Sequence, residues 1–183
     1  SAQDLPGHSE ANNVFDEAFK IGKGFLKFAY LDTSKNANIQ RRLKLDNKSP
    51  HYCVFYASGR KCIQTNVSAR ELINFASFYL PDLAEKASSE WLKKDESNSA
   101  AILFTDKKDT PLLWSAVSTA FHKSTFRIGI SNDHEFAKQL GIDREFPVIV
   151  FHNYSHTIVY EGQNDFISLT TNIKKFWRKK FYK

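Results

Sequence analysis

The chain has 183 residues, a formal net charge of +6, 42% hydrophobic residues and 14% aromatic residues, which suffice for a packed core. This composition excludes an intrinsically disordered chain, and no run approaches the roughly 18 apolar residues of a membrane-crossing helix. Residues 1–10 lack the pattern of a signal peptide, so we expect a soluble protein without a membrane span. There is no glycine-rich phosphate loop, and we expect no cofactor.

The chain opens with Pro6-Gly7-His8-Ser9, followed by a predicted helix over residues 10–22. An apolar run over 25–31 comes next and is typical of a strand that is covered on both faces. Residues 37–45 then have the i, i+4 apolar spacing of a short amphipathic helix. Ser34 is placed to open that helix.

Pro50 precedes a second extended run, 52–56, which a turn at 57–60 joins to a short strand at 61–63. A closing helix begins after Ser68, where Ser68 and Glu71 form the pattern of a capping box, and Pro81 ends it. The first part of the chain therefore reads helix, strand, helix, strand, strand, helix.

The two cysteines lie on the two strands of this hairpin. A turn that pairs Ala57 with Arg60 places Phe55 opposite Cys62, so that Cys53 and Cys62 share a face but are diagonal neighbours, about 7 Å apart. A disulfide requires Cβ atoms about 3.8 Å apart. We therefore expect two buried free thiols.

The second part of the chain has a similar order. It begins with a first helix at 85–94 that contains Trp91, a strand at 101–104, a charged loop at 105–111 and a helix at 112–122. A strand at 126–130 and a helix at 134–142 follow. The last elements are a strand at 148–151, a turn at 153–156, a strand at 157–160, and a helix that opens near Asn164-Asp165. The first strand of this copy is not evident.

The two parts match when the sequence is shifted by 97 residues. Residues 37–45 then align with 134–142 without a gap, Ser34 aligns with Ser131, and Pro50 aligns with Pro147. Such an ordered series at one offset predicts two domains, 1–82 and 83–183, each with a strand, a helix, a two-stranded hairpin and a closing helix.

This order of elements resembles the C-terminal half of a thioredoxin fold, as found in modules of the protein disulfide isomerase family, including endoplasmic reticulum modules attached to J-domain co-chaperones. Residues 28–36 look like the third strand of these modules leading into their third helix, and Ser49-Pro50 and Phe146-Pro147 match their cis-proline position. The resemblance implies an α/β fold of two three-layer thioredoxin-like modules, of which the first lacks its N-terminal β-α-β part.

The resemblance also places the cysteine pair of the family. The family has Cys-Gly-His-Cys where this chain has Pro6-Gly7-His8-Ser9, and the corresponding loop of the second copy, 105–111, contains no cysteine. Thiol–disulfide exchange needs an attacking thiolate and a second, resolving thiol. We therefore expect a redox-inactive protein that is not an enzyme.

The family binds extended peptide in the groove between the active-site loop and the cis-proline loop, by strand-like pairing. By resemblance, the groove of the first copy comprises His8, Ser9, Ser49, Pro50 and His51, and that of the second comprises Thr110, Phe146 and Pro147. The expected partners are unfolded or misfolded polypeptide clients, or another chaperone, in the lumen of the endoplasmic reticulum. Three glycosylation sequons, at Asn47, Asn66 and Asn153, support a secretory route.

Two alternatives remain. One is an oxidoreductase fragment that uses Cys53 and Cys62, or cysteines outside this chain. The other is a basic nucleic-acid or membrane-surface module that uses the cations and aromatic residues of 174–183. We favour instead a last helix with an apolar core face and a solvated basic face, and expect no nucleic acid. The six histidines have no metal-ligand spacing, so we expect no metal site.

Overall fold

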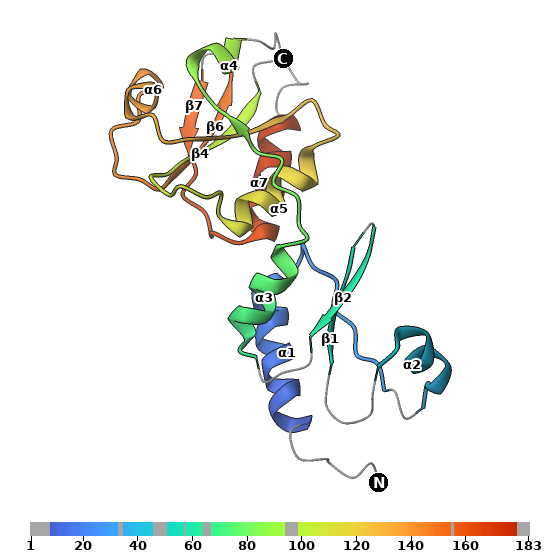
Figure 1. Cartoon of the computed structure of the whole chain (residues 1–183). Coiled ribbons are helices and arrows are strands. Elements are labelled where there is room, and N and C mark those ends of the chain that lie inside the picture. The colour runs from blue at the N-terminus through green and yellow to red at the C-terminus, as the bar shows by residue number, and fades with distance from the viewer. Residues whose placement is uncertain are drawn as a thin grey trace. The chain divides into compact units, whose positions relative to one another are not determined.

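The computed structural model describes residues 8–32, 35–45, 51–56, 58–63, 67–93, 99–154 and 156–178, without the side chains of 8–10. The chain divides into two compact units, Ser1–Tyr79 (unit 1) and Leu80–Lys183 (unit 2), which Figure 1 colours from blue to green and from green to red. The predicted domain boundary lies at 82/83. That each unit is a copy of one thioredoxin-like module stays a prediction.

Unit 2 is built on a mixed five-stranded sheet with the order β3-β5-β4-β6-β7. The strands are β3 (Glu85–Lys86), β4 (Ala100–Phe104), β5 (Arg127–Ser131), β6 (Val148–Asn153) and β7 (His156–Val159). The pairs β3–β5 and β5–β4 are parallel, whereas β4–β6 and β6–β7 are antiparallel. β4 therefore lies at the centre of the sheet, and all five of its residues are buried.

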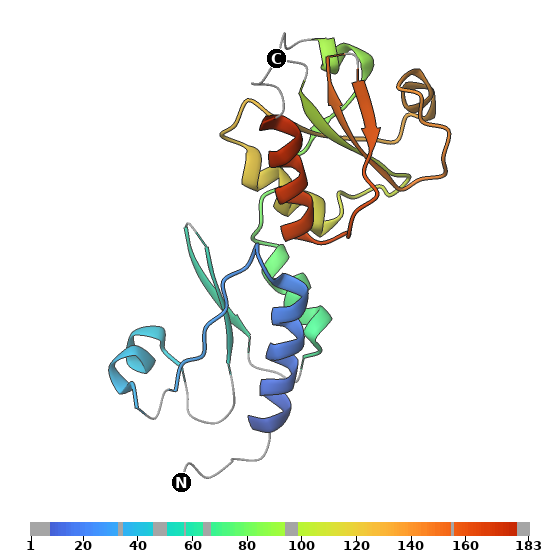
Figure 2. The ribbon, with the colours of Figure 1, turned by 180° about the vertical axis from the view of Figure 1, so that it is seen from behind.

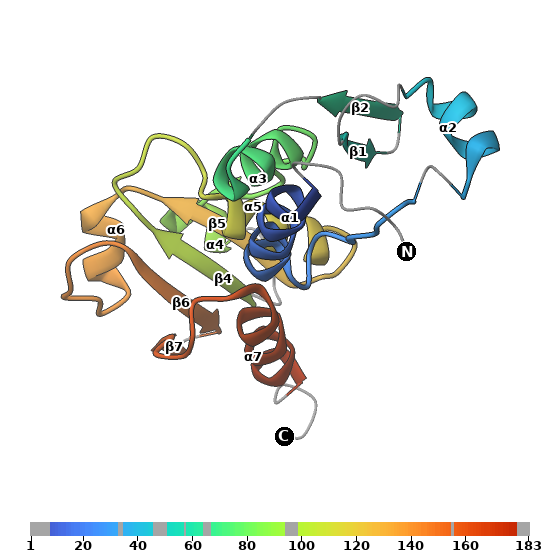
Figure 3. The same ribbon diagram turned by 90° about the horizontal axis from the view of Figure 1, so that it is seen from below.

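Helices cover both faces of this sheet. Alternate side chains of β4 point to opposite faces. Ile102 and Phe104 join the apolar cluster under α4 (Ser89–Lys93) and α6 (His134–Gln139). Ala101 and Leu103 join the cluster under α5 (Leu112–Phe121) and α7 (Phe166–Arg178). Figure 2 shows α5 and α7 side by side, and Figure 3 shows α6 and α7 on opposite sides of the sheet. The three-layer α/β/α arrangement predicted for this part of the chain is confirmed.

The beginning of unit 2 differs from the prediction of one helix over 85–94. Residues 85–86 form β3 and the helix starts only at Ser89, because Glu85 and Lys86 pair with β5 at the edge of the sheet. Gly129 of β5 allows this close packing, since a Cβ there would lie 2.9 Å from the Trp91 ring. Arg127 stacks 3.8 Å above that ring.

His152 of β6 is only 7% exposed, although it lies close to the turn of the hairpin. Its Nδ1 lies 2.9 Å from the Thr157 hydroxyl of β7. Burial lowers the pKa of His152, since it disfavours the charged imidazolium. This histidine faces the core because it occupies an inward position of β6, two residues after the buried Val150.

The last helix is arranged as expected. Asp165 caps α7 by accepting a hydrogen bond of 2.9 Å from the Ser168 backbone N–H. Phe176 and Trp177 pack against the core cluster, with Phe176 5.6 Å from Phe151 between ring centroids. The cations of this helix are exposed. The aromatic residues of the basic cluster are thus core residues over the part of α7 that is described.

Unit 1 contains three helices and one hairpin within the described residues. The helices are α1 (His8–Gly22), α2 (Ala37–Leu43) and α3 (Ala69–Ser77), and the hairpin consists of β1 (Tyr52–Tyr56) and β2 (Gly59–Ile63). α1 and α3 lie side by side, and both contribute buried residues, among them Ala18, Leu72 and Ile73.

The strand predicted over 25–31 is wrong, because these residues form no ladder in the described part of the chain. Lys23 and Leu26 form only an isolated bridge. The run packs its aromatic side chains on α1 instead, with Phe28 5.4 Å from Phe15 between ring centroids. A strand needs a partner for its backbone groups, and apolar composition alone does not supply one.

The offset of 97 residues recurs in the structure. Cys53 pairs with Cys62 in unit 1 as Val150 pairs with Val159 in unit 2, so the two hairpins share one register. α2 corresponds to α6 and α3 to α7 at the same offset. The cap residues correspond as well: Ser68 accepts from the Glu71 backbone N–H as Asp165 accepts from Ser168.

One expected cap is wrong. Ser131 is the last residue of β5, and Asp133 caps α6 by accepting from the backbone N–H groups of Glu135 and Phe136. α2 begins after Asn36, and the predicted opening residue Ser34 lies outside the described residues. None of the helices in the described ranges is both long enough and apolar enough to cross a membrane.

Candidate functional site

The three predicted groove residues of unit 2 lie at the carboxyl ends of β4 and β5. Phe104, the last residue of β4, pairs with Val148, the first residue of β6, so Pro147 stands directly beside the end of β4. The peptide bond between Phe146 and Pro147 is cis, as the resemblance implies. Thr110 is half-buried at the end of the loop that leads from β4 into α5.

Two residues that the sequence did not single out join this loop to Phe146. His134, at the start of α6, lies with its Nε2 3.0 Å from Asp106 Oδ1 of the loop. Its ring also stacks on Phe146, with centroids 4.1 Å apart and planes 8° from parallel. Asp106, His134 and Phe146 thus form a continuous series of contacts across the end of the sheet.

The base of the loop is fixed by the backbone. The Thr105 N–H donates to the Ser131 carbonyl over 2.9 Å, which extends the β4–β5 pairing by one residue, and the Lys107 N–H donates to the Thr105 hydroxyl. The charged side chains from Asp106 to Asp109 are exposed. The loop therefore leaves the sheet at a fixed point and presents polar groups to solvent.

An open hollow of about 320 Å³ adjoins Phe146. Its floor is apolar, with Ala137, Ile142 and the ring of Phe146, and its rim carries charges of both signs, namely Lys138, Asp143, Arg144 and Glu145. Such a lining suits a side chain with an apolar body better than a small charged metabolite.

The backbone beside Phe146 has hydrogen-bonding capacity left over. No backbone hydrogen bond joins Glu145 or Phe146 to another described residue, and Glu145 is exposed. Backbone N–H and C=O groups require partners, and an extended peptide supplies both. This segment can therefore pair with a bound peptide beside the hollow.

The predicted groove of unit 1 falls largely outside the described residues. Ser49 and Pro50 lie outside them, and so do the side chains of His8 and Ser9, whose backbone forms the first turn of α1. His51 is half-buried immediately before β1. The groove of unit 1 stays a prediction.

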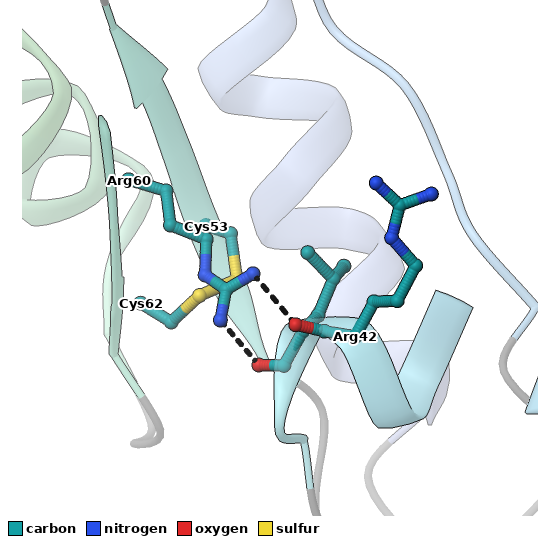
Figure 4. Close-up of a disulfide and its surroundings, with 5 residues drawn as sticks. Arg42, Cys53, Arg60 and Cys62 are labelled. Atoms are coloured by element: carbon teal, nitrogen blue, oxygen red, sulfur yellow. Dashed lines mark hydrogen bonds between the residues drawn. A yellow bond between two sulfur atoms is a disulfide. The ribbon is translucent and has the colours of Figure 1, made fainter. Parts of the chain in front are cut away.

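The two cysteines form a disulfide, which corrects the expectation of free thiols. Cys53 and Cys62 face each other across the hairpin with Cα atoms 4.1 Å apart, and their sulfur atoms are bonded (Figure 4). The hairpin pairs Tyr56 with Gly59, so the turn lies one residue earlier than predicted. Applying the 97-residue offset to the second hairpin would have given this register.

Arg60 connects this hairpin to the end of α2. Its guanidinium donates to the carbonyl oxygens of Arg42 and Leu43, at 3.4 and 2.8 Å (Figure 4). These carbonyls belong to the last turn of a helix, where backbone acceptors lack helical partners and a cation is favoured. The disulfide and this contact together hold β1, β2 and α2 as one body.

The structure describes no free cysteine and no metal-holding cluster. The loop at the end of β4 contains no cysteine, and the only two cysteines of the sequence are bonded to each other in unit 1. No group of three or more histidine, cysteine or acidic side chains among the described residues is arranged to hold a metal ion.

No family model matches the chain, and no curated protein matches it. Among solved structures, the crystal structure of full-length ERdj5 is similar, with a TM-score of 0.61 and 10% identity over 97% of this chain and 28% of that one. Form II of ERdj5 gives a TM-score of 0.55 at 11% identity, over 91% of this chain and 24% of that one. The chain thus spans about a quarter of the length of these proteins.

At such identities the similarity establishes the fold alone. This chain has an α/β fold of the thioredoxin-like kind, with a mixed five-stranded sheet and flanking helices in unit 2.

Proposed function

We propose that the chain is a non-catalytic binding unit that holds extended segments of unfolded polypeptide clients, or of a partner chaperone, during protein folding in the secretory pathway. The observation that carries the proposal is the backbone of Glu145 and Phe146, which has no hydrogen-bond partner among the described residues and lies beside an apolar hollow at the end of the sheet of unit 2. Strand-like pairing gives affinity for many sequences, and the hollow accepts one apolar side chain.

The contacts of Phe146 support a preformed site. The Phe146 ring contacts both the His134 ring and the Phe104 ring, at 4.1 and 5.6 Å between centroids. A residue held on two sides loses little further freedom when a peptide binds beside it. The Asp106–His134 contact keeps the loop at 105–111 next to the same place.

The lack of catalysis and the compartment are further parts of the proposal. The loop at 105–111 has no thiol to attack a disulfide. The Cys53–Cys62 disulfide is typical of an oxidising compartment, which supports the lumen of the endoplasmic reticulum.

Binding is tested with a permanently unfolded, carboxymethylated polypeptide that carries a fluorescent label. We expect saturable binding by fluorescence anisotropy, and a loss of about tenfold in affinity for His134→Ala, which corresponds to about 1.4 kcal/mol. His156→Ala is the matched control, because His156 is an exposed histidine on β7 that the site does not use. No binding, or equal loss in both variants, would contradict the proposal.

The oxidoreductase alternative has one observation in its favour, the disulfide itself. An insulin-reduction assay with a dithiol reductant separates the two functions. We expect no turnover above the reductant alone, whereas turnover that disappears in Cys53→Ala would establish an enzyme and overturn the non-catalytic function.

A further inference from the structure

β1 and its counterpart β6 differ in how many neighbours they have. β6 pairs with β7 on one edge and with β4 on the other. β1 pairs with β2 on the edge that corresponds to β7, and none of the described strands lies along its other edge. The place that β4 fills in unit 2 thus has no described occupant beside β1.

The register shows which backbone groups face that edge. In antiparallel pairs, the closely spaced Cα pairs are those that do not hydrogen-bond to each other. Cys53 and Cys62 have Cα atoms 4.1 Å apart, so the N–H and C=O of Cys53 point away from β2, and so do those of Phe55, two residues on. No described residue is hydrogen-bonded to these groups. Their counterparts Val150 and His152 pair with β4.

The described part of unit 1 also has exposed apolar side chains. Phe55 itself is 65% exposed. Among the described residues, unit 1 has more exposed large hydrophobic side chains than the longer unit 2: Phe19, Ile21, Tyr30, Leu31, Ile39, Phe55 and Phe78 against Leu83, Tyr154, Ile158 and Ile167. An exposed apolar side chain on a strand edge without a described partner, such as Phe55, marks a place where another strand can add.

Two contacts keep β1 extended before any segment binds to its edge. A two-stranded hairpin alone is marginally stable in water. The Cys53–Cys62 disulfide and the contact of Arg60 with the end of α2 keep β1 extended without a third strand. An edge that is already extended costs little further ordering when a segment binds.

We propose that the outer edge of β1 binds an extended apolar segment of another polypeptide, which pairs antiparallel with Cys53 and Phe55. The chemistry of the occupant follows from β4, whose five residues, Ala100–Phe104, are all apolar and all buried. This site is in unit 1 and does not depend on the groove of unit 2.

The probe is a synthetic peptide with the sequence of residues 99–105, extended by lysines for solubility. Amide hydrogen exchange of the full chain, followed residue by residue, reports the pairing. We expect the peptide to slow exchange at Cys53 and Phe55 by at least about tenfold, because their N–H groups gain partners. Val54 already pairs with Lys61 of β2, and its exchange rate stays unchanged.

Two substitutions separate backbone pairing from other contacts. Phe55→Pro removes the aromatic ring together with an N–H that points away from β2, and it should abolish the effect at Cys53. Phe55→Ala removes the ring but keeps that N–H, and it should retain the effect. Alkylation and mass measurement verify that the disulfide is intact in both variants. If Phe55→Pro does not fold, Ile102→Pro in the peptide gives the same test, because a peptide without that N–H should not bind.

Three outcomes would overturn the proposal: no peptide binding, binding without slower exchange at Cys53 and Phe55, or full protection of both amides in the free protein. A dimer of the free chain that protects both amides would assign the edge to a second copy, which also contradicts it. His134→Ala should leave the peptide effect intact, so failure here and failure of the proposed function are separate results.

Discussion

The two hairpins share one register, yet they are stabilised by different means. In unit 2, β6 and β7 belong to a five-stranded sheet, and the Val150–Val159 pair packs into the core under α4 and α6. In unit 1, the equivalent pair is the Cys53–Cys62 disulfide, in a sheet of two strands. The disulfide constrains the hairpin of unit 1, whose described strands lack the burial that the five-stranded sheet gives to β6 and β7.

The largest expected effect is in the core of unit 2. Leu169 of α7 is fully buried, and Leu169→Ala should lower the free energy of unfolding by about 2–5 kcal/mol through lost burial and a cavity. The three tryptophans all lie in unit 2, so their fluorescence in urea follows this unit alone. Ile167→Ala, at an exposed position of the same helix, is the control. Equal destabilisation by both variants would contradict the assigned core.

The disulfide should matter to unit 1 only. Replacing both cysteines by alanine, Cys53→Ala with Cys62→Ala, should lower the free energy of unfolding of unit 1 by about 2–3 kcal/mol. The disulfide joins residues nine positions apart, and without it the unfolded chain is no longer constrained by this closed loop. Amide exchange of α3 measures this loss. The tryptophan-detected transition of unit 2 should not move, and a shift there would show that the hairpin of unit 1 stabilises both units.

The two units also differ in the residue that caps their last helix. Ser68 caps α3 within a capping box, at the position that Asp165 has before α7. Ser68→Ala should destabilise α3 by about 1 kcal/mol, since the Glu71 N–H loses its partner. Faster exchange of the amides in the first turn of α3 is the readout. Unchanged exchange would mean that tertiary packing alone fixes the start of this helix.

The smallest effect concerns pH. Burial lowers the pKa of His152, so the unfolded state binds more protons than the folded state between that lowered pKa and about 6.5. The free energy of unfolding of unit 2 should therefore rise with pH through this window and be fully regained above it. His152→Gln should flatten the rise in tryptophan-detected urea midpoints. The equivalent residue of unit 1, Phe55, has no titrating group.

Much of the architecture could be predicted from the sequence, because the repeat aligns α2 with α6, the two hairpins and α3 with α7. The hairpin register differs from the prediction because the Ser58-Gly59 dipeptide is typical of a turn, whereas the pairing of Tyr56 with Gly59 places the turn one residue earlier. β3 was missed because two exposed charged residues, Glu85 and Lys86, have no strand pattern. The strand expected at 25–31 was wrong because composition does not show whether a pairing partner is present.

Within the candidate site, Phe146 and Pro147 could be placed from the resemblance, but Asp106 and His134 could not. Their contact joins residues 28 positions apart on a loop and a helix, and neither residue stands out in the sequence. The sequence signal that could have indicated His134 is the cap at Asp133, because the residue that follows the cap of α6 lies at the carboxyl end of the sheet.

The main difference between the two hairpins is that β6 is paired on both edges, whereas its counterpart β1 is paired only with β2 among the described strands. Amide exchange of the free chain tests it directly at equivalent positions 97 residues apart. We expect the amides of Cys53 and Phe55 to exchange at least about a hundredfold faster than those of Val150 and His152, because only Val150 and His152 pair with β4. Equal protection at the four amides would contradict it.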